Sequence, residues 1–119
     1  MQFMLLIHTD ETYMKEAMAA GGAPAMMTAY RAYTDAMKAA GVWVGGDALQ
    51  PSTTAAVVRT RDGKTQVLDG PYADVKEQLG GYYLIEVKDR AEALDWAARC
   101  PGAERGTMEV RPLMVFAPA

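Results

Sequence analysis

Few residues of this chain have side chains suited to acid–base chemistry. His8 is the single histidine, and because imidazole changes its charge near neutral pH, it is a candidate acid or base. It ends an apolar stretch, where we favour the alternative of a half-buried, hydrogen-bonded histidine. Asp47 follows Gly45-Gly46. Its carboxylate either lies over a pocket or stabilises a turn, and the sequence leaves both hypotheses open.

The remaining reactive residue types exclude several other chemistries. Cys100 precedes a proline at an expected helix C-terminus, where the helix dipole disfavours a thiolate, so we do not expect a nucleophile. One histidine and one cysteine are too few for a zinc site of the usual His/Cys type. The glycines lack the strand–turn–helix context of a nucleotide-binding loop. The sequence therefore predicts neither a metal nor a cofactor.

Composition limits the partners and the compartment. The chain has 119 residues, and we expect one domain over residues 1–119. Its 12 Lys+Arg are scattered and are outnumbered by 15 Asp+Glu, which argues against nucleic acid as a partner. The longest apolar run, residues 3–7, is too short to cross a bilayer, so we expect no membrane association. A single cysteine and no evident signal peptide favour the cytoplasm.

Apolar periodicity and turn residues predict the order of the elements. We expect strands over residues 2–8, 42–49, 54–60, 65–68, 79–87 and 107–116, and helices over residues 11–19, 24–40 and 90–100. Asp62-Gly63 between two β-prone runs predicts a tight hairpin. Without this hairpin the order is β-α-β-β-α-β. The sequence therefore predicts an α+β fold of the ferredoxin-like, split βαβ type with an added β-hairpin.

Both faces of the predicted sheet carry apolar side chains. Helices should cover one face, while Met4, Leu6, Tyr82 and Leu84 occupy the other. Large exposed apolar patches are rare on monomers. We therefore predict a homodimer in which the two sheets face each other.

Aromatic and charged side chains on these elements indicate where a ligand would bind. If Tyr30 on the long helix and Tyr82 on a strand line one cavity, they form an aromatic-walled site for a small organic molecule. Arg111, on the last predicted strand, is a candidate contact for an anionic ligand. An ion pair with a carboxylate near Glu109 is the simpler expectation for this side chain.

Residues 69–81 form a long and specific motif with the sequence DGPYADVKEQLGG. It resembles the signature of the DGPF branch of the YCII-related proteins. The resemblance covers nearly the whole chain, from Gly45-Gly46-Asp47 to Glu109-Val110-Arg111-Pro112. Tyr72 stands where the branch has Phe. The resemblance implies a ferredoxin-like fold of the dimeric α+β barrel type, and it implies no known reaction.

The same resemblance bears on individual residues. Some YCII-like relatives are thought to use a His–Asp pair, and their histidine falls at Tyr30 here. A phenol titrates near pH ~10 and is a poor base at neutral pH. Within the motif, Asp69 has a structural explanation as a turn residue. Lys76 contacts a ligand, contacts a second protomer or belongs to a solvated loop, and these alternatives stay open.

Two classes of function follow from these observations. The first is a small dimeric domain that binds a small organic molecule, either as a binding protein or as an enzyme with an altered acid–base site near His8, Asp47 and Tyr30. The second is a non-catalytic accessory or regulatory module, because similar proteins are often found beside sigma factors. The likeness to dimeric barrels adds cofactor-independent monooxygenases as a third, weaker hypothesis.

Overall fold

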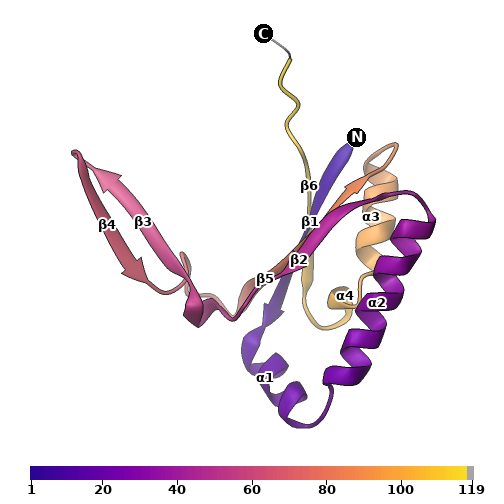
Figure 1. Cartoon of the computed structure of the whole chain (residues 1–119), viewed down its shortest axis with the longest axis horizontal. Helices are drawn as coiled ribbons and strands as arrows, with labels where there is room; N and C mark the ends of the chain where they lie inside the picture. Colours follow the sequence, from indigo (N-terminus) through magenta and orange to yellow (C-terminus); the bar gives the residue numbers. More distant parts are fainter. Residues whose placement is uncertain (118–119) are drawn as a thin grey trace.

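The structure is a computed structural model that describes residues 1–117 (Figure 1). Its strands are β1 (Gln2–Asp10), β2 (Trp43–Ala48), β3 (Ala56–Arg61), β4 (Lys64–Asp69), β5 (Glu77–Glu86) and β6 (Thr107–Pro112). Its helices are α1 (Glu11–Ala19), α2 (Ala23–Ala39), α3 (Arg90–Arg99) and α4 (Gly102–Arg105), with a 3-10 turn η1 (Ser52–Thr54). The sequence-based bounds are confirmed to within two residues, except at the last strand.

Four strands form an antiparallel sheet in the order β2-β5-β1-β6. The first and the fifth strands of the chain are therefore central, and the strands that follow each helical segment lie at the edges. Helices α2 and α3 cover one face of this sheet (Figure 1). This arrangement confirms the expected ferredoxin-like α+β fold.

The core lies between the sheet and these helices, and strand alternation selects its members. Phe3 of β1 pairs with Ile85 of β5, and both point to the helix side together with Leu5. Leu5 and Ile85 have no exposed surface. Met37 of α2 and Trp96 of α3 close this core from the other side. Met37 is fully buried and fills this core with its flexible thioether side chain.

Side-chain caps fix the starts of two helices. The Asp10 carboxylate accepts hydrogen bonds from the backbone amides of Thr12 and Tyr13 at 3.0 and 3.3 Å. Asp89 accepts one from the amide of Glu92 at 2.9 Å. Both aspartates thus satisfy amides that have no partner inside the helix, as their positions in the sequence indicate.

Strands β3 and β4 form a separate two-stranded ribbon, residues 56–69, which we call the arm. Asp62 and Gly63 have φ angles of 51° and 74°, the left-handed pair that a two-residue hairpin turn requires. The predicted hairpin is confirmed. Figure 1 shows that the arm stands clear of the body and away from α2 and α3. The radius of gyration is accordingly 16.5 Å, against about 13.5 Å for a compact chain of this length.

One expectation near the C-terminus is wrong, and one helical turn there is unexpected. The last strand does not reach residue 116 but ends at Pro112. The amide of Leu113 still donates to the Gln2 carbonyl at 2.9 Å, but β1 begins there, so the residues beyond have no neighbouring strand. Pro101 and Gly102 also do not simply end α3. They begin the extra turn α4, which the sequence analysis missed because a single turn has no periodicity.

The sheet face opposite the helices, which we call the open face, has an apolar centre and polar edges. Met4 lies between Leu84 and Arg111, and Leu6 lies between Tyr82 and Glu109, in rows across the strands. The four central side chains are only half-buried. No element in residues 1–117 covers this centre as α2 and α3 cover the other face. Within the same residues, no helix is both long and apolar enough to cross a membrane.

Candidate functional site

A cavity of about 470 Å³ lies between the sheet and helices α1 and α2. Its walls are mainly thioether and aromatic side chains, and one acidic residue borders it at the edge strand β2. These residues are Met14, Met18, Met26, Met27, Tyr30, Trp43, Tyr82, Tyr83 and Asp47. Ligand sites commonly have volumes of about 300–1,000 Å³ and mostly apolar walls, so the cavity suits a small organic molecule.

Glycines form much of the wall that the sheet contributes. A Cβ on Gly46 would lie 2.6 Å from Cδ1 of Tyr83, and one on Gly81 would lie 2.9 Å from the Asp47 carbonyl oxygen. Both distances are shorter than side chains tolerate. The ring of Tyr83 therefore lies directly on Gly46, and the backbones of β2 and β5 approach closely at Gly81. Larger residues at either position would reshape the cavity wall.

Asp47, on the edge strand β2, is the only charged residue among the described residues that line the cavity, but its carboxylate lies beside Tyr82 on the open face of the sheet. Asp47 belongs to β2, so the alternative of a turn residue is wrong. Its Oδ2 accepts a hydrogen bond from the Tyr82 hydroxyl at 2.8 Å, across a directly opposed pair of strand residues. This bond to a carboxylate raises the pKa of Tyr82, because ionisation would remove the donor and place two negative charges side by side.

Tyr30 contributes its ring to the cavity while its hydroxyl points to a structural contact. The hydroxyl lies against the Cys100 thiol, and it would be 2.9 Å from a Cβ on Gly102. Burial, with smaller contributions from Cys100 and Tyr83, raises the pKa of Tyr30 well above its usual value. The phenol therefore remains protonated at neutral pH. Burial likewise raises the pKa of Cys100, which agrees with the expectation that this cysteine is not a nucleophile.

An aromatic cluster supports the cavity from beneath. The rings of Tyr33 and Tyr83 meet edge to face with centroids 5.3 Å apart, and Trp43 meets Tyr83 in the same way at 5.8 Å. The buried hydroxyl of Tyr33 donates to the Trp96 carbonyl at 2.7 Å. These contacts fix the Tyr83 ring. The sequence analysis missed Trp43 and the methionines of α1, although Met14 and Met18 are four residues apart and therefore share a helix face.

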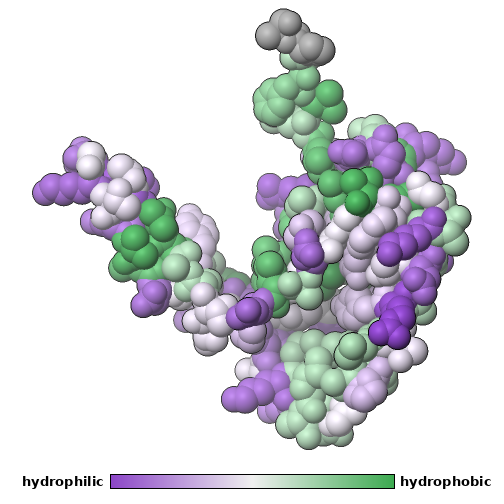
Figure 2. Space-filling model, in the orientation of Figure 1, coloured by the Kyte–Doolittle hydropathy of each residue, from purple (hydrophilic) through white to green (hydrophobic). Residues whose placement is uncertain are grey.

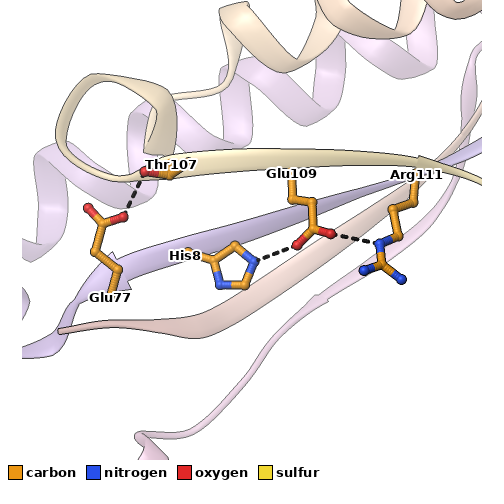
Figure 3. Close-up of polar contacts among 5 residues, drawn as sticks. All are labelled: His8, Glu77, Thr107, Glu109 and Arg111. Atoms are coloured by element: carbon orange, nitrogen blue, oxygen red, sulfur yellow. Dashed lines mark hydrogen bonds and ion pairs between the residues drawn. The ribbon is translucent and has the colours of Figure 1, made fainter. Parts of the chain in front are cut away.

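His8 does not line this cavity but lies on the other side of the sheet (Figure 3). Its Nε2 is 3.2 Å from Oε1 of Glu109, while Nε of Arg111 donates to Oε2 of the same carboxylate at 2.6 Å. Arg111 and, secondarily, His8 hold the pKa of Glu109 below its usual value. The half-buried, hydrogen-bonded histidine and the ion pair of Arg111 are both observed. The site that would combine His8 with Tyr30 and Asp47 is not formed.

The motif begins at the root of the arm, and only its last residues, Gly80 and Gly81, reach the cavity. Gly70 has a φ of 108°, and its amide donates to the Ala55 carbonyl at 2.7 Å, so the turn after Asp69 is closed by the backbone. Lys76 borders a groove with Glu11 and Ser52. The structure thus brings together Tyr30, Asp47 and Tyr82, and it leaves Asp69, Lys76, His8 and Arg111 outside the cavity.

Comparison with known proteins agrees with this architecture. The YCII-related domain matches residues 1–117. The chain belongs to the YCII-related family. An uncharacterised protein of Rhizobium meliloti (strain 1021) is 47% identical over 72 residues, which are 59% of this YCII-related chain and 58% of that protein. The match thus spans less than two thirds of the relative's length.

Proposed function

We propose that this YCII-related protein binds a small organic molecule in the cavity between the sheet and α1 and α2. The observation that carries the proposal is a cavity wall of methionine and aromatic side chains, bordered at the edge strand β2 by Asp47, whose carboxylate lies beside Tyr82. Such a wall favours an apolar, preferably aromatic body. The carboxylate favours a ligand group that is positively charged or donates hydrogen bonds. The proposed ligand class is therefore an aromatic or aliphatic amine rather than an acid.

In this proposal Asp47 replaces Tyr30 as the acid–base group of the site. The Tyr30 hydroxyl is held by its contact with Cys100, and its raised pKa makes it unsuitable as a base. The Asp47 carboxylate has one oxygen bonded to Tyr82, and Oδ1 has no partner among residues 1–117. An exposed carboxylate at this edge of the sheet is available to accept a hydrogen bond from the ammonium or hydroxyl group of a ligand.

A matched pair of probes tests the ligand class. Tryptamine and indole-3-acetate share an indole ring and carry opposite charges. We expect tryptamine to bind more tightly than indole-3-acetate in calorimetry, and to raise the melting temperature, because a ligand that binds only the folded state stabilises it. Asp47→Asn should weaken tryptamine binding about tenfold or more, since it removes the charge and keeps the shape.

Asp95→Asn provides the control, because Asp95 is an exposed carboxylate on α3 outside the cavity. It should leave tryptamine binding unchanged. Equal binding of the two probes, or an unchanged affinity in Asp47→Asn, would contradict the proposed ligand class. Failure of a broad set of amines to bind would favour the alternative of a non-catalytic accessory module.

We also propose that the protein forms the homodimer for which its open face is suited, and that it belongs to the DGPF branch. The dimer is supported by the apolar centre of Met4, Leu6, Tyr82 and Leu84, bordered by charged residues, which is the usual anatomy of an interface. The branch assignment is supported by the motif at residues 69–81. Both proposals leave the reaction unspecified.

A further inference from the structure

The apolar side chains of the arm are more exposed than is usual in a stable two-stranded hairpin. Val58 and Val67 form a directly opposed pair in the arm and are 64% and 62% exposed, and Leu68 is 57% exposed. Figure 2 shows apolar side chains gathered midway along it. Two-stranded ribbons are marginally stable in water unless a third strand or another element packs against them. Apart from its root, nothing in residues 1–117 packs on this arm.

We infer that the arm of each copy packs against the second copy of this chain, across the dimer interface formed by the open faces. The inference rests on the proposed homodimer and goes beyond it, since sheets can face each other without using the arms. Each copy offers an unsupported apolar arm and an uncovered apolar sheet face. In a dimer with a two-fold axis, each copy would cover both the arm and the open sheet face of the other. The assembly would then be closed at two copies.

The pattern of side chains along the arm fits this occupant. The Val58–Val67 face continues toward the tip with Thr60 and Thr65, whose hydroxyl groups are 3.2 Å apart. This face carries no charge before Asp69 at the root. An uncharged ribbon face of valine and threonine is suited to packing on a half-buried sheet. The open face of the second copy, next to the sheet-to-sheet contact, presents the matching surface.

Charge also favours a second copy of this acidic chain. The other arm face places Arg59, Arg61 and Lys64 together near the tip. The arm has three cations and two carboxylates, whereas the rest of the chain has nine cations and thirteen carboxylates. On the open face, Asp47 and Glu86 lie outside its apolar centre. A basic arm approaching an acidic body is attracted, and the same charges disfavour nucleic acid as the occupant of the arm.

Sedimentation of the full chain tests the inference with three substitutions. Val67→Asp places a charge in the apolar arm face, and Leu84→Asp places one at the centre of the open face. Leu94→Asp is the matched control, since Leu94 is an exposed leucine on α3, on the helix side. We expect a wild-type dimer, a loss of dimer affinity of about tenfold or more for both Val67→Asp and Leu84→Asp, and no loss for the control.

The outcomes separate the arm from the dimer itself. If Leu84→Asp yields a monomer and Val67→Asp dimerises like the wild type, the arm inference is overturned and the proposed dimer stands. A wild-type protein that is a monomer at micromolar concentration overturns both. Circular dichroism verifies that each variant is folded.

Hydrogen exchange gives a second readout that needs no substitution. Backbone amides of residues 57–68 should become protected as the protein concentration rises through the dissociation constant, because the arm then gains its packing partner. Rapid exchange of these amides at every concentration would overturn the inference even if the protein dimerises. Amides of the core strand β1 should stay protected throughout and serve as the internal reference.

Discussion

The two faces of the central sheet come from the same strands and differ in every other respect. On the helix side, Leu5 and Ile85 are fully buried, and they pack against Met37 and Trp96. On the open side, their sequence neighbours Leu6 and Leu84 are only half-buried. A strand that alternates between two apolar faces needs a cover on each. The comparison shows that one chain supplies the first cover and leaves the second to another element.

The strongest test of this difference exchanges a residue on each face for alanine. Leu5→Ala should lower the free energy of unfolding by about 2–5 kcal/mol, because it leaves a cavity in a packed core. Leu6→Ala should cost less than about 1 kcal/mol at concentrations where the protein is monomeric. Urea denaturation of both variants measures the contrast. Equal losses would mean that the open face is as well packed within one copy as the helix face.

Removing a tyrosine hydroxyl from each face should give an intermediate effect. Tyr33→Phe leaves the buried carbonyl of Trp96 without its 2.7 Å donor and should cost about 1–3 kcal/mol. Tyr82→Phe removes a donor to Asp47 in an exposed position and should cost less, while weakening amine binding if it misplaces that carboxylate. Thermal unfolding and calorimetry follow the two effects separately. A greater loss of stability in Tyr82→Phe would contradict the contrast between the faces.

The smallest expected effect is a pH dependence of the open face. Arg111 and His8 lower the pKa of Glu109, so its carboxylate stabilises the folded state above the usual value of about 4.3, and this contribution is lost as the pH falls through the lowered pKa. Glu109→Gln should therefore be slightly less stable than the wild type at neutral pH and equally stable near pH ~2. Glu16→Gln, on the exposed side of α1, is the control. A stability difference that is constant with pH would contradict this account.

The fold was predictable because the sequence features that indicate its helices, strands and turns are local. Strand alternation in residues 2–8 and 79–87, the Asp62-Gly63 turn and the capping aspartates each depend on a few neighbouring residues. The direction of the arm was not predictable in this way. A turn sequence determines how two strands pair, but it contains no information on where the ribbon points.

The candidate site was predictable only in part, because its contacts join distant segments. The hypothesis that Tyr30 and Tyr82 line one cavity came from the sequence, and both residues border it, although the Tyr82 hydroxyl bonds to Asp47 on the open face. Glu109, the partner of His8, lies 101 residues further along the chain, so no spacing rule links the two. Strand alternation alone assigns His8 to the face of Met4 and Leu6, away from the helices, but it does not identify the partner of the imidazole. The register of β2 with β5 places the Asp47 carboxylate on that same face, beside Tyr82, and only Asp47 also borders the cavity.

The methionine wall of the cavity has a chemical consequence of its own. Peroxides convert thioethers to sulfoxides, which are polar and larger, and exposed methionines react first. Met27 and Met18 are 61% and 42% exposed, so the cavity begins to oxidise at its rim. Oxidation would turn an apolar wall into one rich in hydrogen-bond acceptors while leaving the core around Met37 intact. If the cavity binds an apolar ligand as proposed, oxidation of these methionines should weaken that binding, and methionine sulfoxide reductases should restore it.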